Sequence, residues 1–185
     1  ARASTTPEEN SEQKHMAPCI YGITSCYDIH LFAMDDEELL AACCQKRETQ
    51  ALRPGQGDVI RNLQNKNQCL AIMPTGGGKS LLWLLTTHIW NTQYREGVGA
   101  RPLTLVIVPF KALVFSHLQE SAPWFECLSS ENSPTELQRG INTCSVIYTT
   151  PEKLVKNIAF QEIIVANADR IRLIALDEVH VVTEQ

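Results

Sequence analysis

The residues best equipped for chemistry lie between Met73 and Ser80, where the sequence reads MPTGGGKS directly after a short apolar run. In phosphate-binding loops, glycine N–H groups surround the phosphates, a lysine reaches the terminal phosphates, and a serine or threonine hydroxyl ligates Mg²⁺. Lys79 and Ser80 match the last two roles. Met73 stands where the usual pattern has glycine, but the glycines that follow can adopt the positive φ angles of a tight loop. The segment predicts a nucleoside triphosphate site made by Thr75, Gly76, Gly77, Gly78, Lys79 and Ser80.

The flanking sequence supports this interpretation. The apolar run at residues 69–73 has the length of a buried parallel strand, and residues 81–85 predict a helix that is apolar almost all round and therefore buried. A strand, a glycine loop and a helix in this order direct the positive end of the helix at an anion. The alternative is a flexible glycine loop in an ordinary α/β domain.

A second motif follows the apolar run Leu173–Leu176, which ends in Asp177 and Glu178. Carboxylates at the end of a buried strand are costly unless they have a role. In phosphoryl-transfer sites the first carboxylate holds Mg²⁺, and a neighbouring one orients or deprotonates the attacking water. The order of Asp177 and Glu178 fits these roles. The alternative is an exposed acidic turn, which the presence of the glycine loop disfavours.

Composition limits the class of protein. The chain has 185 residues, 44% of them hydrophobic, which suits one well-buried domain. The net charge of −5 argues against coating of nucleic acid by bulk electrostatics, although a local strip could still bind it. No apolar run is long enough to span a bilayer, and the polar N-terminal segment carries no secretion signal. We therefore expect an intracellular protein without membrane contact.

The seven cysteines are odd in number and have no repeated spacing, so a disulfide framework is not expected. One partial exception is the set His15, Cys19, Cys26 and His30, which has the ligand types of a zinc site without its usual spacing. A zinc site there is a minor alternative to small buried residues.

The chain divides into three expected regions. Residues 1–17 are polar and predict a disordered lead-in or linker, and the start at Ala1 suggests a fragment. Residues 18–49 predict a helical N-terminal extension, because Asp35 and Glu38 bracket a possible capping box before a helix at about 36–46. Residues 50–185 form the main domain.

In the main domain, strands and helices alternate. Predicted strands are Cys69–Met73, Leu103–Val108, Phe125–Leu128, Ser145–Tyr148 and Leu173–Leu176, and predicted helices are Gln56–Gln64, Lys79–Trp90, Lys111–Glu120 and Glu152–Ile158. Such alternation predicts an α/β fold with a mostly parallel sheet and helices on both faces. Ligands then lie at the carboxyl ends of the strands. Residues 92–102 and 129–142 are predicted to be exposed loops.

Five motifs occur in the order typical of one family. LRPGQGDVI resembles the family's adenine-side motif, and MPTGGGKS resembles its phosphate loop, which in this family also lacks the leading glycine. VIVPFKALV and YTTPEKL resemble two motifs that contact a single strand, and DEVH stands where DEAH is usual. Over residues 50–185 the chain resembles the first motor domain of the RecQ family of superfamily 2 DNA helicases. The resemblance implies a RecA-like P-loop NTPase fold, truncated after the DEVH strand.

The resemblance also implies roles for individual residues. Arg53 and Gln56 would contact the adenine base, and His180 would relay the nucleotide state to the DNA-binding parts. The implied catalytic residues are Lys79, Asp177, Glu178 and His180; the implied metal ligands are Ser80 and Asp177; and the implied nucleic-acid contacts are Pro109, Lys111, Thr149 and Thr150. Leu52 and Val179 depart from the usual Phe and Ala of the family.

The implied activity is that of an ATP-dependent 3′ to 5′ DNA helicase with ATP and Mg²⁺ as cofactors. It would couple ATP hydrolysis to translocation on single-stranded or forked DNA in the nucleus. Translocation requires a second RecA-like lobe, which this chain lacks, so the fragment alone is expected to be inactive. The alternatives are an RNA helicase or another superfamily 2 translocase, and a degenerate module that binds ATP or nucleic acid without activity.

Overall fold

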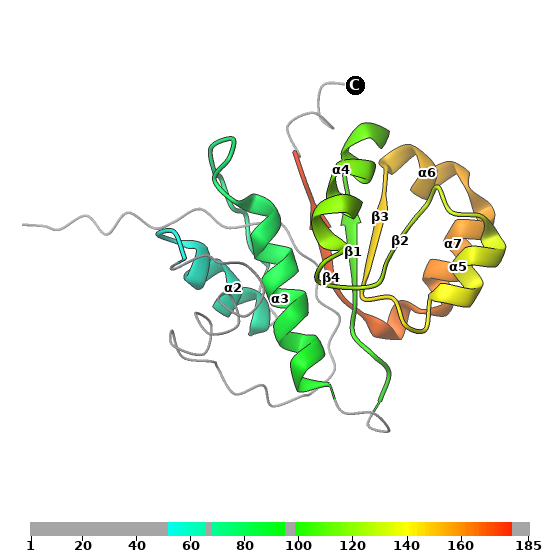
Figure 1. The fold of residues 1–185 in the computed structure, drawn as a ribbon, viewed down its shortest axis with the longest axis horizontal. Coiled ribbons are helices and arrows are strands. Elements are labelled where there is room, and N and C mark those ends of the chain that lie inside the picture. Colours follow the sequence, from blue (N-terminus) through cyan, green and yellow to red (C-terminus); the bar gives the residue numbers. More distant parts are fainter. Residues whose placement is uncertain (1–51, 66–67, 95–98, 179–185) are drawn as a thin grey trace, which may run out of the picture.

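The computed structural model describes residues 52–65, 68–94 and 99–178 of the chain (Figure 1). The predicted lead-in, the helix at 36–46, the possible zinc ligands and His180 lie outside the described residues.

The centre of the fold is a parallel sheet of four strands in the order β2-β3-β1-β4. The strands are β1 (Leu103–Ile107), β2 (Cys127–Ser129), β3 (Val146–Thr149) and β4 (Ile171–Leu176). Ile107 is in register with Thr149 on one side and with Leu176 on the other, so the carboxyl ends of the three strands align. The segments that follow these strands therefore meet at one edge of the sheet.

Helices cover both faces of the sheet, as the sequence predicts (Figure 1). They are α2 (Gln56–Gln64), α3 (Lys79–Gln93), α4 (Lys111–Ser121), α5 (Pro134–Gly140), α6 (Pro151–Lys156) and α7 (Ile158–Ala166), with the 3₁₀ turn η1 (Ala168–Arg170) before β4. Because side chains alternate along a strand, Val106 packs in the core beneath α2, α3 and α4, and Leu105 packs in the core beneath α5 and α7. Within the described part of the chain, no helix is both long and apolar enough to cross a bilayer.

Helix α3, which begins directly after the phosphate loop, is buried over most of its length. Every residue from Leu81 to Trp90 is buried, which confirms the prediction of a buried helix after the loop. Helix α2 has the predicted bounds and packs against α3. The buried helix α3 and the half-buried helix α2 therefore pack together next to the phosphate loop.

The predicted strand Cys69–Met73 is wrong. Of these residues only Leu70 makes a single bridge, and Leu70 and Ile72 are 40% and 69% exposed. Cys69 is buried, so the segment touches the core without joining the sheet of β1 to β4. Apolar composition favours a strand only where a neighbouring strand supplies a hydrogen-bonded edge.

The predicted exposed loop at 129–142 contains α5. Ser133 caps this helix, because its hydroxyl accepts from the Glu136 N–H at 3.3 Å and the Glu136 carboxylate accepts from the Ser133 N–H at 2.7 Å. Leu137, on the inner side of this helix, is buried. The predicted helix Glu152–Ile158 is also divided, since α6 ends at Lys156 and Asn157 caps the unpredicted helix α7.

Candidate nucleotide and metal site

The phosphate loop has the backbone that its glycines predict. Gly76 and Gly78 have φ angles of 72° and 83°, in the left-handed region that favours glycine, and the Gly77 N–H donates to the Pro74 carbonyl at 2.9 Å. A Cβ at Gly77 would lie 2.8 Å from the Pro74 oxygen, and a Cβ at Gly78 would lie 2.7 Å from Nε2 of Gln56. Thr75 lies exposed in the same loop. The loop therefore has no room for side chains at Gly77 and Gly78.

Arg53 and Gln56, the predicted adenine contacts, both donate hydrogen bonds to carbonyl groups of the phosphate loop. Arg53 Nη1 donates to the Gly76 carbonyl. The buried amide of Gln56 donates from Nε2 to the carbonyls of Gly77 and Gly78, at 3.2 Å in each case, and accepts from the Arg53 N–H at 2.8 Å. Both ends of the Gln56 amide are thus bonded within the chain. A contact between these residues and an adenine base remains a prediction.

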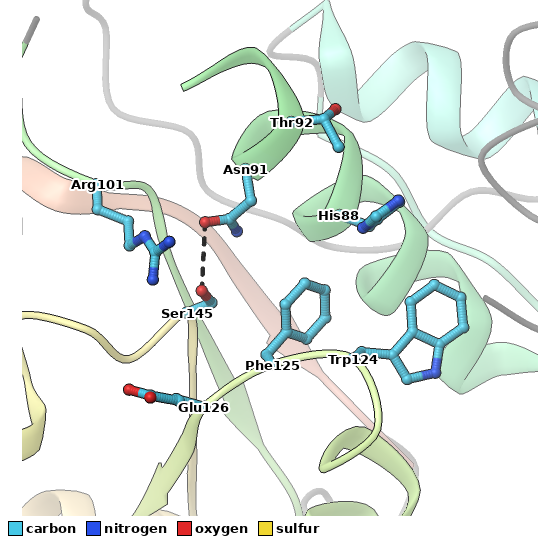
Figure 2. A pocket seen from close by; sticks show the side chains of 8 residues that line it. All are labelled: His88, Asn91, Thr92, Arg101, Trp124, Phe125, Glu126 and Ser145. Carbon is cyan, nitrogen blue, oxygen red and sulfur yellow. Dashed lines mark hydrogen bonds between the residues drawn. The ribbon is translucent and has the colours of Figure 1, made fainter. Parts of the chain in front are cut away.

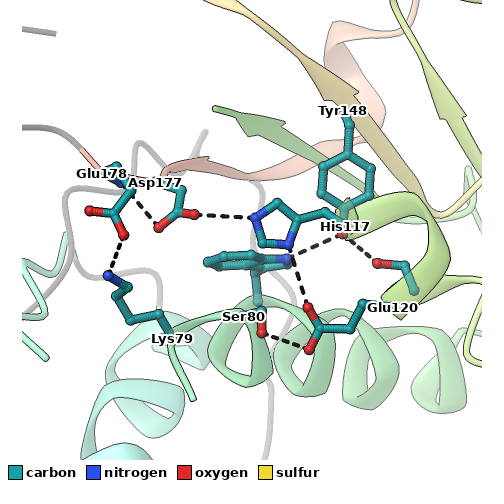
Figure 3. Close-up of polar contacts among 9 residues, drawn as sticks. Lys79, Ser80, His117, Glu120, Tyr148, Asp177 and Glu178 are labelled. Atoms are coloured by element: carbon teal, nitrogen blue, oxygen red, sulfur yellow. Dashed lines mark hydrogen bonds and ion pairs between the residues drawn. The ribbon is translucent and has the colours of Figure 1, made fainter. Parts of the chain in front are cut away.

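The two predicted catalytic motifs meet in space (Figure 3). Lys79 Nζ and Glu178 Oε1 form an ion pair at 2.5 Å. Asp177 is only 8% exposed, and its N–H donates to the Ile107 carbonyl, which fixes it at the end of β4. Glu178 has a φ of 52°, which is unusual for a residue other than glycine and turns the chain directly after Asp177. The predicted convergence of loop and acidic motif is present.

Helix α4 contributes two residues that the sequence motifs do not contain. The Ser80 hydroxyl donates to Oε1 of Glu120 at 2.8 Å. The second oxygen of Glu120 lies 3.4 Å from Nδ1 of His117, and Nε2 of His117 lies 3.2 Å from Oδ2 of Asp177. A continuous set of contacts therefore joins Ser80 to Asp177 through Glu120 and His117 (Figure 3).

Aromatic side chains enclose His117. Its ring stacks on Tyr148 at a centroid distance of 5.7 Å and an interplanar angle of 11°, and Trp83 meets it edge-on at 5.4 Å. Burial lowers the pKa of His117, but the hydrogen bonds to Asp177 and Glu120 outweigh burial and raise its pKa to about 9. The imidazole therefore carries a positive charge between two carboxylates at neutral pH.

The predicted nucleic-acid contacts lie at the same carboxyl edge but differ in accessibility. Lys111, at the start of α4, is 60% exposed, and its Nζ forms an ion pair with Glu131 at 2.5 Å. Lys153 contacts the other oxygen of Glu131 at 3.4 Å. Pro109 is partly buried just before α4. The result is a small basic surface, formed by Lys111 and Lys153, whose charges Glu131 partly offsets.

The two predicted threonines are engaged within the chain. Thr149 is buried, and its hydroxyl donates to the Thr150 carbonyl at 3.2 Å. The Thr150 hydroxyl accepts from the Lys153 N–H at 3.3 Å and so caps α6. Their side chains position α6 in this arrangement, and contacts with a nucleic-acid strand remain a prediction.

The residues at this edge fit a Mg²⁺·nucleotide complex. The loop glycines have the positive φ angles that a phosphate-binding loop needs, and α3 begins with its N-terminus at the end of this loop. A lysine, a serine hydroxyl and a buried carboxylate converge on it, which is the donor set that Mg²⁺ and phosphates prefer. These side chains come from the start of α3 and from the turn after β4.

A separate hollow of about 300 Å³ lies at the opposite end of the sheet (Figure 2). Arg101, Glu126 and Ser145, which precede β1, β2 and β3, line it together with His88, Asn91, Thr92, Trp124 and Phe125. The Ser145 hydroxyl donates to Oδ1 of Asn91 at 3.3 Å within it. None of the predicted site residues lines this hollow.

The parallel α/β fold and the loop chemistry define a domain of the P-loop NTPase class. A sequence model described as "DEAD/DEAH box helicase" matches residues 53–185. The chain belongs to the DEAD/DEAH box helicase family.

Curated relatives support the RecQ-like character of the chain. ATP-dependent DNA helicase hus2/rqh1 of Schizosaccharomyces pombe is 30% identical over 159 residues, which cover 80% of this chain and 12% of the relative. ATP-dependent DNA helicase RecQ of Haemophilus influenzae is 29% identical over 143 residues, covering 73% and 21%. The RecQ helicase of Synechocystis is 32% identical over 136 residues, covering 68% and 26%. The chain thus spans between 12% and 26% of the length of these relatives. The predicted resemblance to RecQ-like helicases is confirmed.

Proposed function

We propose that this chain is the ATP-binding part of an ATP-dependent DNA helicase that couples hydrolysis to 3′ to 5′ movement along single-stranded DNA. One observation carries the proposal. The Lys79–Glu178 ion pair brings the phosphate loop and the DEVH carboxylates together in a member of a helicase family. The relatives named as ATP-dependent DNA helicases favour DNA over RNA as the substrate.

In this proposal, the loop amides of Gly76 to Gly78 and the Lys79 ammonium bind the phosphates, and Ser80 and Asp177 hold Mg²⁺. When bound, Mg²⁺ neutralises phosphate charge and polarises the phosphoryl group. Glu178 accepts a proton from the attacking water. Because Lys79 is paired with Glu178, engagement of Lys79 by phosphate releases the Glu178 carboxylate for this role.

DNA would pass over the surface formed by Lys111 and Lys153. Ammonium groups neutralise backbone phosphates without reading sequence, which suits a motor that moves along any strand. Pro109, Thr149 and Thr150 would shape the backbone beside them. Residues 50–185 would form the first RecA-like domain, preceded by a linker at 1–17 and a helical extension at 18–49. A second RecA-like lobe would complete the motor in the nucleus.

The test is ATP hydrolysis by the intact protein, with and without single-stranded DNA, in the variants Lys79→Ala and Glu178→Gln. We expect both variants to lose DNA-stimulated hydrolysis, and Glu178→Gln to retain nucleotide binding because it keeps the phosphate contacts. Glu152→Gln, an exposed carboxylate on α6, is the matched control and should hydrolyse ATP like the wild type. Undiminished hydrolysis in both site variants would remove the proposal.

Two alternatives have separate tests. An RNA helicase or another superfamily 2 translocase would be revealed if RNA displaces DNA in a competition assay and stimulates hydrolysis better. A degenerate module that has lost ATP binding would be revealed if ATP with Mg²⁺ fails to raise the melting temperature of the intact protein, since a ligand that binds the folded state must stabilise it.

A further inference from the structure

We infer that Glu120 is a positioning residue of the magnesium site, which orients the Ser80 hydroxyl directly and Asp177 through His117. The inference rests on the proposed function, because it concerns the same nucleotide site. It adds to that site a part of α4 that lies outside the phosphate loop and the DEVH motif.

The first step concerns the proton of Ser80. A serine hydroxyl has one proton to donate and two lone pairs, and a hydroxyl that ligates a cation uses a lone pair while keeping its proton. That proton needs an acceptor. The Ser80 hydroxyl donates to Oε1 of Glu120 at 2.8 Å, which is a hydrogen bond of ordinary length to a carboxylate. Glu120 thereby fixes the rotation of the hydroxyl and leaves its lone pairs for a metal ion.

The second step concerns Asp177. Its Oδ1 accepts from the Glu178 N–H at 3.0 Å, and its Oδ2 lies 3.2 Å from Nε2 of His117. The other nitrogen of the imidazole lies 3.4 Å from Oε2 of Glu120. The two oxygens of one carboxylate therefore serve the two predicted metal ligands, one directly and one through the imidazole. Such outer hydrogen bonds orient the ligands of metal sites and tune their affinity.

The third step is the rigidity of this outer shell. His117 cannot rotate without losing its stacking on Tyr148, and the Tyr148 hydroxyl is itself bonded to Ser121 at 2.5 Å and to Trp83 Nε1 at 3.3 Å. Glu120 is 27% exposed, so it can exchange partners more readily than His117 can. The aromatic packing therefore fixes the His117 ring between Asp177 and Glu120, and the fixed ring limits the positions from which the Glu120 carboxylate can contact it.

Two substitutions of Glu120 separate the effect of its hydrogen bond to Ser80 from the effect of its charge. Glu120→Ala removes the acceptor for the Ser80 proton. Glu120→Gln keeps one acceptor oxygen for the Ser80 hydroxyl, but it loses the charge and places an NH₂ donor opposite Nδ1 of His117. If Glu120 acts mainly by orienting Ser80, the glutamine variant should recover part of the Mn²⁺ affinity that the alanine variant loses.

The experiment measures Mn²⁺ binding to the intact protein with ADP by electron paramagnetic resonance, with Mn²⁺ as the probe for Mg²⁺. ADP affinity in EDTA is measured in parallel. We expect Glu120→Ala to weaken Mn²⁺ binding about tenfold while leaving ADP affinity in EDTA unchanged, because outer-shell losses in metal sites cost about 10- to 100-fold. Glu126→Ala removes an exposed carboxylate at the opposite end of the sheet and is the matched control.

A double-mutant cycle locates the effect. If Glu120 acts through Ser80, Glu120→Ala should weaken Mn²⁺ binding far less when Ser80→Ala is already present. Should Glu120→Ala fail to fold, Glu120→Met replaces it, since methionine has similar length and no carboxylate acceptor. Wild-type Mn²⁺ affinity in a folded Glu120→Ala or Glu120→Met variant overturns the inference and leaves the proposed function standing. Absence of Mn²⁺·ADP binding by the wild type overturns the proposed function itself.

Discussion

Gly78 meets two separate requirements of the phosphate loop, a φ angle of 83° and an empty position beside Nε2 of Gln56. Gly99 has a φ of 75° but nothing within 4 Å of the position of a Cβ. We expect Gly99→Ala to lower the free energy of unfolding by about 1–2 kcal/mol, which is the cost of placing alanine in the left-handed conformation. Gly78→Ala should lower the free energy of unfolding by more, because its methyl group would also displace the Gln56 amide. Urea unfolding of both variants checks this, and equal losses would contradict it.

The raised pKa of His117 gives a pH dependence with a defined sign. A group whose pKa is higher in the folded state stabilises that state below its unfolded pKa, about 6.5 for histidine, and this contribution is lost as the pH rises through about 9. In EDTA, the difference in melting temperature between the wild type and His117→Gln should therefore shrink from pH 6.5 to about 9. A difference that does not change over this range would show that the charge of His117 is unimportant.

Residues of the site differ in how far the sequence reveals them. Lys79, Asp177 and Glu178 belong to motifs, and parallel strands bring the segments after them to one edge, so their convergence was predictable. Glu120 and His117 carry no motif. Their one signal is a spacing of three residues, which places both on one face of a helix, and many surface residues share that spacing. The spacing gains meaning only in the folded chain, where Glu120 contacts Ser80 and His117 contacts Asp177.

At the scale of elements, α5 depends on its first turn. Removal of a serine cap costs about 1 kcal/mol because it leaves a helix N–H without its acceptor, and Ser133→Ala should destabilise the protein by about this amount. Thr135→Ala in the same turn is the control, and it should be neutral or slightly stabilising since alanine is the better helix former. Thermal unfolding of the pair checks the prediction, which fails if the two variants melt together.

Element predictions failed where local composition and tertiary contacts disagree. Helix α5 contains Pro, Thr and Gly and reads as a loop, but its capping box and the burial of Leu137 stabilise a short helix. Cys69–Met73 fails in the opposite direction, because a single strand's sequence cannot indicate whether a pairing partner is beside it. The starts of α2 and α3 were predictable because Gly55 and Gly78 directly precede them.

Glu131 connects two elements of the proposed DNA surface, since it pairs with Lys111 at the start of α4 and with Lys153 in α6. DNA phosphates must compete with this carboxylate for both lysines. We expect Glu131→Gln to bind single-stranded DNA several-fold more tightly and with a steeper salt dependence, because more lysine charge is available to phosphates. Fluorescence anisotropy at several salt concentrations measures both quantities.

The control for this prediction is Glu152→Gln, which releases only the exposed pair with Lys156. It should bind DNA like the wild type. Unchanged or weaker binding by Glu131→Gln would mean that the strand does not contact these lysines.

At the scale of the whole molecule, the two inner strands should be the last to open. β1 is hydrogen-bonded to β3 and β4, and β3 to β1 and β2, while separate apolar cores cover the two faces. Hydrogen exchange followed by mass spectrometry should find slower exchange in β1 and β3 than in α5 and α6, whose opening exposes less of the core. Equal protection of all these elements would indicate that the described domain opens only as one unit.

The edge-on packing of Trp83 against His117 gives the molecule an internal optical reporter. The indole emission responds to the charge and distance of the imidazole beside it. The imidazole contacts one predicted magnesium ligand, Asp177, directly and is connected to the other, Ser80, through Glu120. Fluorescence of a protein in which Trp90 and Trp124 are replaced by Phe would therefore follow events at the metal position without any added label.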